Sequence, residues 1–167
     1  MISINEFMTA RPYTLRETDS LSDARAVMTG RNIRHIPITD EDKHLLGLVT
    51  QRDVLAATAP ASSLQTKSAP QAGDSDIKLS DIMIRDISVI HETDSLRQAA
   101  LYLQSHKYGC LPVLSGNELV GIITDSDFID IAINLLEQVE IAEQETSGDI
   151  EGEDAFDEVA LVAPQDV

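Results

Sequence analysis

The chain has 167 residues, enough for one compact domain and a tail, and 43% of them are hydrophobic, enough for a core. Its 29 acidic side chains outnumber 12 basic ones, which argues against DNA or RNA as a partner because phosphate contact needs a basic surface. No apolar run in the sequence reaches the roughly 18 residues of a membrane span, and the first residues lack the basic and apolar regions of a secretory signal. We therefore expect no membrane association and a cytoplasmic location.

The single cysteine supports this location. Cys110 has no partner for an internal disulfide, and it opens an apolar run that is typical of a buried strand. No activating base stands next to it in the sequence, so we expect an inert buried thiol in a reducing compartment.

The sequence repeats itself at an offset of 75 positions. Residues 17–21 read Glu-Thr-Asp-Ser-Leu, and residues 92–96 read the same. After a slip of one residue, Gly-Leu-Val-Thr-Gln-Arg-Asp at 47–53 aligns with Gly-Ile-Ile-Thr-Asp-Ser-Asp at 121–127. A tandem duplication predicts two similar units packed face to face, with ligand-binding clefts between them.

Each repeat predicts the same elements in the order β-α-β-β-α. In the first repeat they are a lead-in ending at Met8, an extended piece at 13–15, a helix after Ser20, strands at 36–38 and 45–49, and a helix from Thr50. In the second repeat they are a lead-in ending at Met83, an extended piece at 88–90, a helix after Ser95, strands at 111–114 and 119–123, and a helix from Thr124. The fold class is therefore α/β, of the mixed α+β kind, with two repeats related by a pseudo-twofold axis.

Composition divides the chain into four parts. The first repeat spans 1–58 and the second spans 77–140. Residues 59–76 are rich in small and polar residues with Pro and Gly, which indicates a flexible linker. Residues 141–167 are acidic and contain no Lys or Arg, so we expect a disordered acidic tail.

The last helix carries two apolar stripes. The members of the first are Phe128, Ile131, Ala132, Leu135 and Val139, and those of the second are Ile129, Ile133 and Leu136. One stripe is expected to pack on its own domain, which leaves the other for self-association. The alternative is a helix buried more deeply within the monomer.

The repeated motif G-h-h-T-x-x-D, with h apolar, lies where a buried strand becomes a helix. Unpaired N–H groups at the helix start attract phosphate, the Thr hydroxyl can donate to the same group, and the Asp can accept from ribose hydroxyls. The Gly would let the backbone approach the ligand closely. The alternative is that Thr and Asp form an ordinary capping box, which both helices need.

In each repeat, four features occur in order: the lead-in Met, the Thr-Asp-Ser-Leu helix start, the h-P-h strand and G-h-h-T-x-x-D. Together they resemble a tandem pair of CBS domains, the fold named after cystathionine β-synthase, over roughly residues 1–140. The resemblance implies a Bateman module whose two units pair through their sheets, commonly dimerise and often bind adenosine nucleotides in their clefts.

The resemblance also implies roles for individual residues. Ribose contact falls to Asp53 and Asp127, and phosphate-side contact falls to Thr50, Thr124, Arg52 and Ser126. Arg34 matches a family position that is often basic and contacts phosphate; the alternative is a surface side chain paired with a carboxylate. Gly109 holds that position in the second repeat, so the two clefts are expected to differ. His35 lies beside Arg34 as a candidate pH-sensitive contact, and no His spacing indicates a metal site.

These expectations favour a non-enzymatic sensor that binds AMP, ADP or ATP, needs no cofactor, forms a homodimer and signals occupancy to an unknown protein partner. One alternative is a structural dimerisation or interaction module with degenerate clefts. Another is a module for S-adenosylmethionine, which would not need Arg34. The sequence contains no P-loop and no nucleophile elbow, which argues against an enzyme.

Overall fold

The computed structural model describes residues 2–58 and 73–148. The chain forms two units, one ending at Phe128 and the other beginning at Ile129. Both repeats lie in the first unit apart from most of the last helix. Within the described ranges, no helix is both long and apolar enough to cross a membrane.

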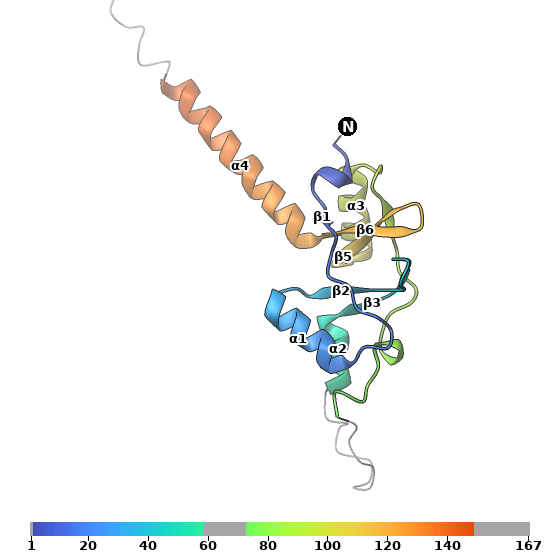
Figure 1. The fold of residues 1–167 in the computed structure, drawn as a ribbon. Helices are drawn as coiled ribbons and strands as arrows, with labels where there is room; N and C mark the ends of the chain where they lie inside the picture. Colours follow the sequence, from blue (N-terminus) through green and yellow to red (C-terminus); the bar gives the residue numbers. More distant parts are fainter. Residues whose placement is uncertain (1, 59–72, 149–167) are drawn as a thin grey trace, which may run out of the picture. The chain divides into compact units, whose positions relative to one another are not determined.

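Apart from their first strands, the two repeats contain matching elements, which confirms the predicted order helix, two strands, helix (Figure 1). The first repeat consists of a 3-10 turn η1 (Ile4–Glu6), β1 (Thr9–Ala10), α1 (Leu21–Arg31), β2 (His35–Thr39), β3 (Leu45–Thr50) and α2 (Gln51–Thr58). The second repeat consists of η2 (Leu79–Asp81), β4 (Ile90–His91), α3 (Leu96–His106), β5 (Cys110–Ser115), β6 (Glu118–Thr124) and α4 (Asp125–Gly148).

Local capping explains where α1 and α3 begin. Ser20 accepts a hydrogen bond from the backbone N–H of Asp23, whose side chain accepts from the N–H of Ser20 in return. Ser95 and Gln98 form the same reciprocal pair at the start of α3. Each pair satisfies N–H groups that the first helical turn leaves unbonded, so the predicted helix starts are confirmed.

The lead-in segments cross between the repeats. Strand β1 of the first repeat pairs antiparallel with β6 of the second, with Thr9 opposite Ile122, in a sheet of order β1-β6-β5-β4 (Figure 1). The reciprocal contact is an antiparallel bridge between Leu48 of β3 and Ile84. The lead-in of each repeat therefore pairs with the second hairpin strand of the other repeat instead of with its own.

The same exchange supplies core side chains. Ile4 and Leu79 are fully buried, and Leu79 and Met83 belong to the apolar core formed around α1, β2 and β3. The backbone N–H of Leu79 donates to Asp19 O at 2.8 Å, and that of Ile4 donates to Asp94 O at 3.2 Å. Because the core around α1, β2 and β3 contains Leu79 and Met83 of the second repeat, the first repeat has no complete core alone.

Two predicted extended pieces are displaced in the structure. The first, at 13–15, forms only an isolated parallel bridge between Leu15 and Ile38, and the strand of that region is instead β1. The second, at 88–90, overlaps β4, which pairs parallel with β5. In both repeats, the piece therefore pairs parallel with the next strand of its own repeat over only a residue or two.

The linker and the tail differ in part from their predictions. Residues 59–72 and 149–167 lie outside the described residues, but 73–76 form a turn in which the Gly73 N–H donates to Asp76. Asp74 in this turn makes an ion pair with Arg25 of α1. Helix α4 continues to Gly148, so the tail predicted from residue 141 begins as helix.

Helix α4 exposes both of its predicted apolar stripes. Phe128 and Ile131 are half-buried, but the other large apolar side chains are 48–62% exposed, namely Ile129, Ile133, Leu135, Leu136 and Val139. Packing of one stripe on its own domain, self-association through the other and deeper burial of the helix all stay predictions, because α4 from Ile129 onward belongs to the second unit.

Candidate functional site

A cavity of about 870 Å³ lies between the repeats within the first unit. This volume suits a small-molecule ligand. Five of the eight predicted site residues line it, namely Arg34, His35, Thr50, Arg52 and Asp53. The other three, Thr124, Ser126 and Asp127, are not among its lining residues.

The Thr50–Asp53 pair forms a capping box at the start of α2. Asp53 Oδ2 accepts from the backbone N–H of Thr50 at 2.8 Å and from its hydroxyl at 2.6 Å. Thr50 Oγ1 in turn accepts from the backbone N–H of Asp53 at 3.3 Å. These bonds use the hydroxyl hydrogen of Thr50 and only one carboxylate oxygen of Asp53. No hydrogen bond from a described residue reaches Asp53 Oδ1, which leaves that oxygen available to a ligand.

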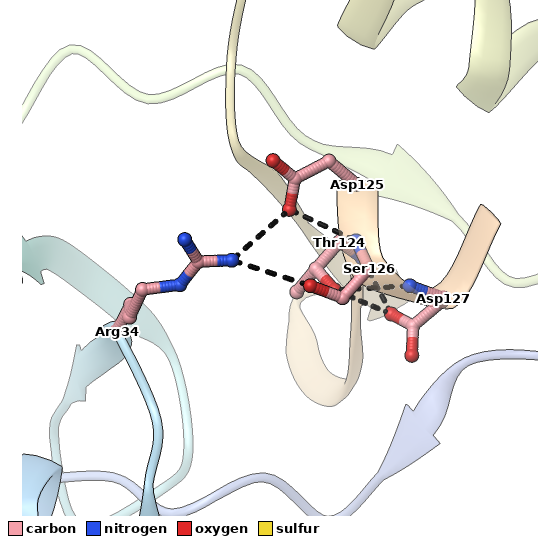
Figure 2. Close-up of polar contacts among 5 residues, drawn as sticks. All are labelled: Arg34, Thr124, Asp125, Ser126 and Asp127. Atoms are coloured by element: carbon pink, nitrogen blue, oxygen red, sulfur yellow. Dashed lines mark hydrogen bonds and ion pairs between the residues drawn. The ribbon is translucent and has the colours of Figure 1, made fainter. Parts of the chain in front are cut away.

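Thr124 and Asp127 repeat this arrangement at the start of α4 (Figure 2). Asp127 Oδ2 accepts from the backbone N–H of Thr124 at 2.6 Å and from its hydroxyl at 2.9 Å. The capping interpretation therefore holds for both copies of the motif. It does not compete with ligand binding at Asp53, since capping occupies only Oδ2.

Arg34 reaches from the first repeat to the second. Its Nη2 donates to Ser126 Oγ at 3.2 Å and lies 3.7 Å from Asp125 Oδ1, as Figure 2 shows. The side chains of Arg34 and Asp125 are 57% and 54% exposed. Arg34 thus lines the cavity and is paired with a carboxylate, as its alternative interpretation expected, while its contact with phosphate stays a prediction.

His35 lies against Gly109. A Cβ atom on Gly109 would be only 2.8 Å from His35 Nε2, so no other residue fits there without displacing the ring. Burial lowers the pKa of His35 below its usual value, an effect that the nearby Asp125 carboxylate partly offsets. The missing basic side chain at 109 therefore has a steric reason.

The motif glycines serve packing between repeats. A Cβ on Gly47 would lie 2.5 Å from Met83 Sδ, and one on Gly121 would overlap Met8 Sδ. The expectation that these glycines let the backbone approach a ligand is replaced by this contact with the lead-in Met of the opposite repeat.

Several cavity residues escaped the sequence reasoning. Ile84, Asp86, Ile87 and Ser88 line the cavity because the second lead-in crosses to the first repeat, and Lys107, Tyr108 and Asp125 line it from the second repeat. The only available signal was the lead-in Met that both repeats share, since it precedes the crossing segment. Burial raises the pKa of Cys110, which also lines the cavity, to about 12, consistent with an inert thiol.

One cluster outside the cavity was also missed. In the β2–β3 turn, ligand-type atoms of Asp40, Asp42 and His44 lie within 4.8 Å of one another. His44 Nδ1 is 2.9 Å from Asp40 Oδ2. This hydrogen bond and the Asp40 charge raise the pKa of His44 above its usual value. The sequence analysis did not single out this D-x-D-x-H turn, and the expectation of no metal site stays a prediction.

Comparison with solved structures supports the fold. A Vibrio cholerae protein assigned to acetoin utilization (AcuB) is 46% identical, with a TM-score of 0.71 over 84% of this chain and 96% of that chain. The CBS domain pair of protein MJ0100, in complex with 5′-methylthioadenosine and S-adenosyl-L-methionine, is 22% identical, with a TM-score of 0.67 over 80% and 98%. CBSX2 in complex with AMP is 24% identical, with a TM-score of 0.67 over 81% and 98%.

Sequence comparison identifies the repeats themselves. The chain is 31% identical over 124 residues to a homoserine O-acetyltransferase of Methanocorpusculum labreanum, and it spans only 23% of that protein's length. The family model described as CBS domain matches residues 4–59 and 79–134, which are the two halves of the duplication. The chain therefore belongs to the CBS domain family and contains two tandem copies of the domain.

Proposed function

We propose that the protein is a sensor that binds an adenosine nucleotide, AMP, ADP or ATP, in the cavity between its CBS repeats and signals occupancy to a protein partner. The observation that carries the proposal is the available Oδ1 of Asp53 in a cavity that is also lined by Arg34, Arg52 and Lys107. A carboxylate oxygen for ribose hydroxyls and three cations for phosphate are what such a ligand requires.

The cavity offers a distinct environment to each part of this ligand. Leu48, Ile84 and Ile87 provide apolar wall for the base. The ribose hydroxyls donate to Asp53 Oδ1, while Thr50 holds the carboxylate in place through its hydroxyl and N–H. The anionic end of the ligand binds to the cationic side chains of Arg34, Arg52 and Lys107. His35, which is neutral, lies beside it.

The second motif provides a weaker candidate cleft. Thr124 and Asp127 repeat the geometry of the first motif, and Ser126 follows the position of Arg52. Gly109 supplies no cation there. We expect this cleft to bind nucleotide poorly, or to take only a neutral adenosine group.

Binding would act through differential affinity rather than catalysis. A ligand that prefers one arrangement of the repeats raises the population of that arrangement. A partner that binds this arrangement then binds more of the protein. The exposed apolar face of α4 is the proposed homodimer surface, and the cytoplasm is the proposed location. The two solved CBS pairs in complex with AMP and with S-adenosylmethionine support testing both ligand types.

S-adenosylmethionine is the second candidate ligand. Asp53, Asp86 and Asp125 all line the cavity, and Arg34 is already paired with Asp125. Such a surface also suits a sulfonium cation. A structural module without a ligand is the remaining alternative.

The relative assigned to acetoin utilization points to a process for the sensor. That similarity covers nearly the whole of the Vibrio cholerae chain at 46% identity. The proposed process is acetoin use, and a strain lacking the protein should grow poorly on acetoin and normally on glucose. Equal growth on both would remove acetoin from the proposal.

The decisive test is isothermal titration calorimetry with AMP, ADP, ATP and S-adenosylmethionine after any bound ligand has been stripped. Asp53→Asn keeps an oxygen for the cap but replaces the ribose acceptor with a donor, and Asp127→Asn makes the same change outside the cavity. We expect saturable binding that Asp53→Asn abolishes and Asp127→Asn preserves. No heat with any of the four ligands would refute the sensor and favour the structural module.

A further inference from the structure

The guanidinium that would bind the ligand's anionic group is already occupied. Arg34 Nη2 contacts both Ser126 Oγ and Asp125 Oδ1, which belong to the first turn of α4 (Figure 2). Arg34 and Asp125 both line the cavity. We call this set of three residues, Arg34, Asp125 and Ser126, the latch.

The latch exists on one side of the module only. The positions that correspond to Arg34, Asp125 and Ser126 in the opposite repeat are Gly109, Gln51 and Arg52. Gly109 has no side chain, and His35 leaves no room for one. The two helices that begin at the repeated motif are α2 and α4. Of these, only α4 can therefore be held by an arginine of the opposite repeat.

The latch can open at little cost. Both charged side chains are more than half exposed, and exposed ion pairs contribute little to stability. Asp125 Oδ1 also accepts from the backbone N–H of Ser126 at 2.9 Å, and the backbone N–H of Asp125 donates to Gly109 O at 3.1 Å. Asp125 therefore keeps two hydrogen bonds when Arg34 leaves it.

We infer that Asp125 is a built-in competitor for the anionic group of the ligand. A phosphate in the cavity draws Arg34 away from Asp125 and Ser126, so a charged nucleotide releases the first turn of α4 and uncharged adenosine does not. This inference rests on the proposed function and adds to it the means by which the phosphate, rather than the adenosine, is sensed. The released turn begins the helix that carries the exposed apolar face.

The test compares AMP with adenosine by calorimetry on the full chain and two variants. Asp125→Asn removes the competing charge but keeps an oxygen for the Ser126 N–H. Asp86→Asn removes the same charge from the same cavity, at a residue that makes no ion pair with Arg34 among the described contacts. We expect Asp125→Asn to bind AMP about two- to fivefold more tightly than the wild type does. This gain in affinity should exceed any gain in Asp86→Asn. The affinity of Asp125→Asn for adenosine should equal that of the wild type.

A spectroscopic readout follows the latch itself. In ¹H–¹⁵N spectra, AMP should shift the Ser126 amide of the wild type much more than adenosine does, and this difference should shrink in Asp125→Asn. Equal AMP affinities in Asp125→Asn and Asp86→Asn, or equal Ser126 shifts with both ligands, would overturn the latch while the nucleotide sensor stands. A wild type that binds neither AMP nor adenosine would overturn both.

Discussion

Met8 of the first repeat packs so closely on Gly121 of the second that a Cβ atom on the glycine would overlap its sulfur. Met83 makes the reciprocal contact with Gly47. Two sequence features that stand far apart in each repeat, the lead-in Met and the motif Gly, are therefore the two halves of one contact. This pair of contacts accompanies the crossing of the lead-ins between the repeats.

Adding a methyl group at these glycines should destabilise the fold. We expect Gly47→Ala to lower the free energy of unfolding by about 1–3 kcal/mol, because overpacking forces neighbouring atoms to shift. Gly121→Ala should cost less, since Met8 is half-buried whereas Met83 lies in the core. Urea unfolding measures both values.

Gly30 provides the matched control. It lies within α1 and has open space around its Cβ position. Gly30→Ala should therefore stabilise the protein by about 0.5–1 kcal/mol through helix propensity. Equal effects at Gly30 and Gly47 would argue against the Met–Gly contact.

A side chain at residue 109 should disturb His35. We expect Gly109→Ala to be destabilising in the wild type because its Cβ would meet His35 Nε2 at 2.8 Å. In a His35→Ala background the same substitution should cost much less, with a coupling of about 0.5–3 kcal/mol between the two sites. Additive costs in a double-mutant cycle would contradict the steric explanation.

Both motif acids should contribute to stability as caps. Asp53→Ala and Asp127→Ala should each lower the free energy of unfolding by about 0.5–2 kcal/mol, since each removes the acceptor that holds the first helical turn. Only Asp53→Ala is expected to remove AMP binding as well. Chemical denaturation with and without AMP separates the two effects, and ligand stabilisation that survives in Asp53→Ala would count against the ribose role.

The pH dependence of stability should carry opposite contributions from two histidines. Burial lowers the pKa of His35, so as the pH falls the unfolded chain binds a proton at this residue before the folded chain does. The contribution of His35 to stability is therefore present above the usual His range and is lost as the pH falls below it. The pKa of His44 is raised by its hydrogen bond to Asp40, so its contribution is present at low pH and is lost as pH rises through the raised pKa. Imidazole NMR titration should show His35 titrating below His44, and the reverse order would refute at least one of the two directions.

The exposed face of α4 should mediate self-association. We expect wild-type protein to sediment as a dimer and Ile133→Glu to shift it toward monomer, because the substitution places a charge in an apolar contact. Asn134→Glu adds the same charge at a polar position of the same helix and should leave the dimer intact. Analytical ultracentrifugation distinguishes these results, and a monomeric wild type would remove the proposed dimer.

The amino-acid sequence by itself determined the local structure of this protein. The starts of α1 and α3 follow from Ser20 and Ser95 with their partners three residues on, and the strands follow from apolar runs that end in polar turns. The same short-range patterns, repeated at an offset of 75 positions, were sufficient to predict the family, and they select Asp53 and Asp127 alike as candidate site residues. These features depend on interactions within a few residues of chain, which local residue types control.

Only the tertiary structure decided which repeat each lead-in joins. Nothing local to Thr9 or Ile84 shows that these residues pair with the opposite repeat, because that pairing depends on the path of the whole chain. The same crossing brings the 84–88 segment to the cavity, and the packing of the two repeats brings Arg34 to the first turn of α4. The cavity is lined by residues far apart in the sequence, which come together only when the two repeats pack against each other.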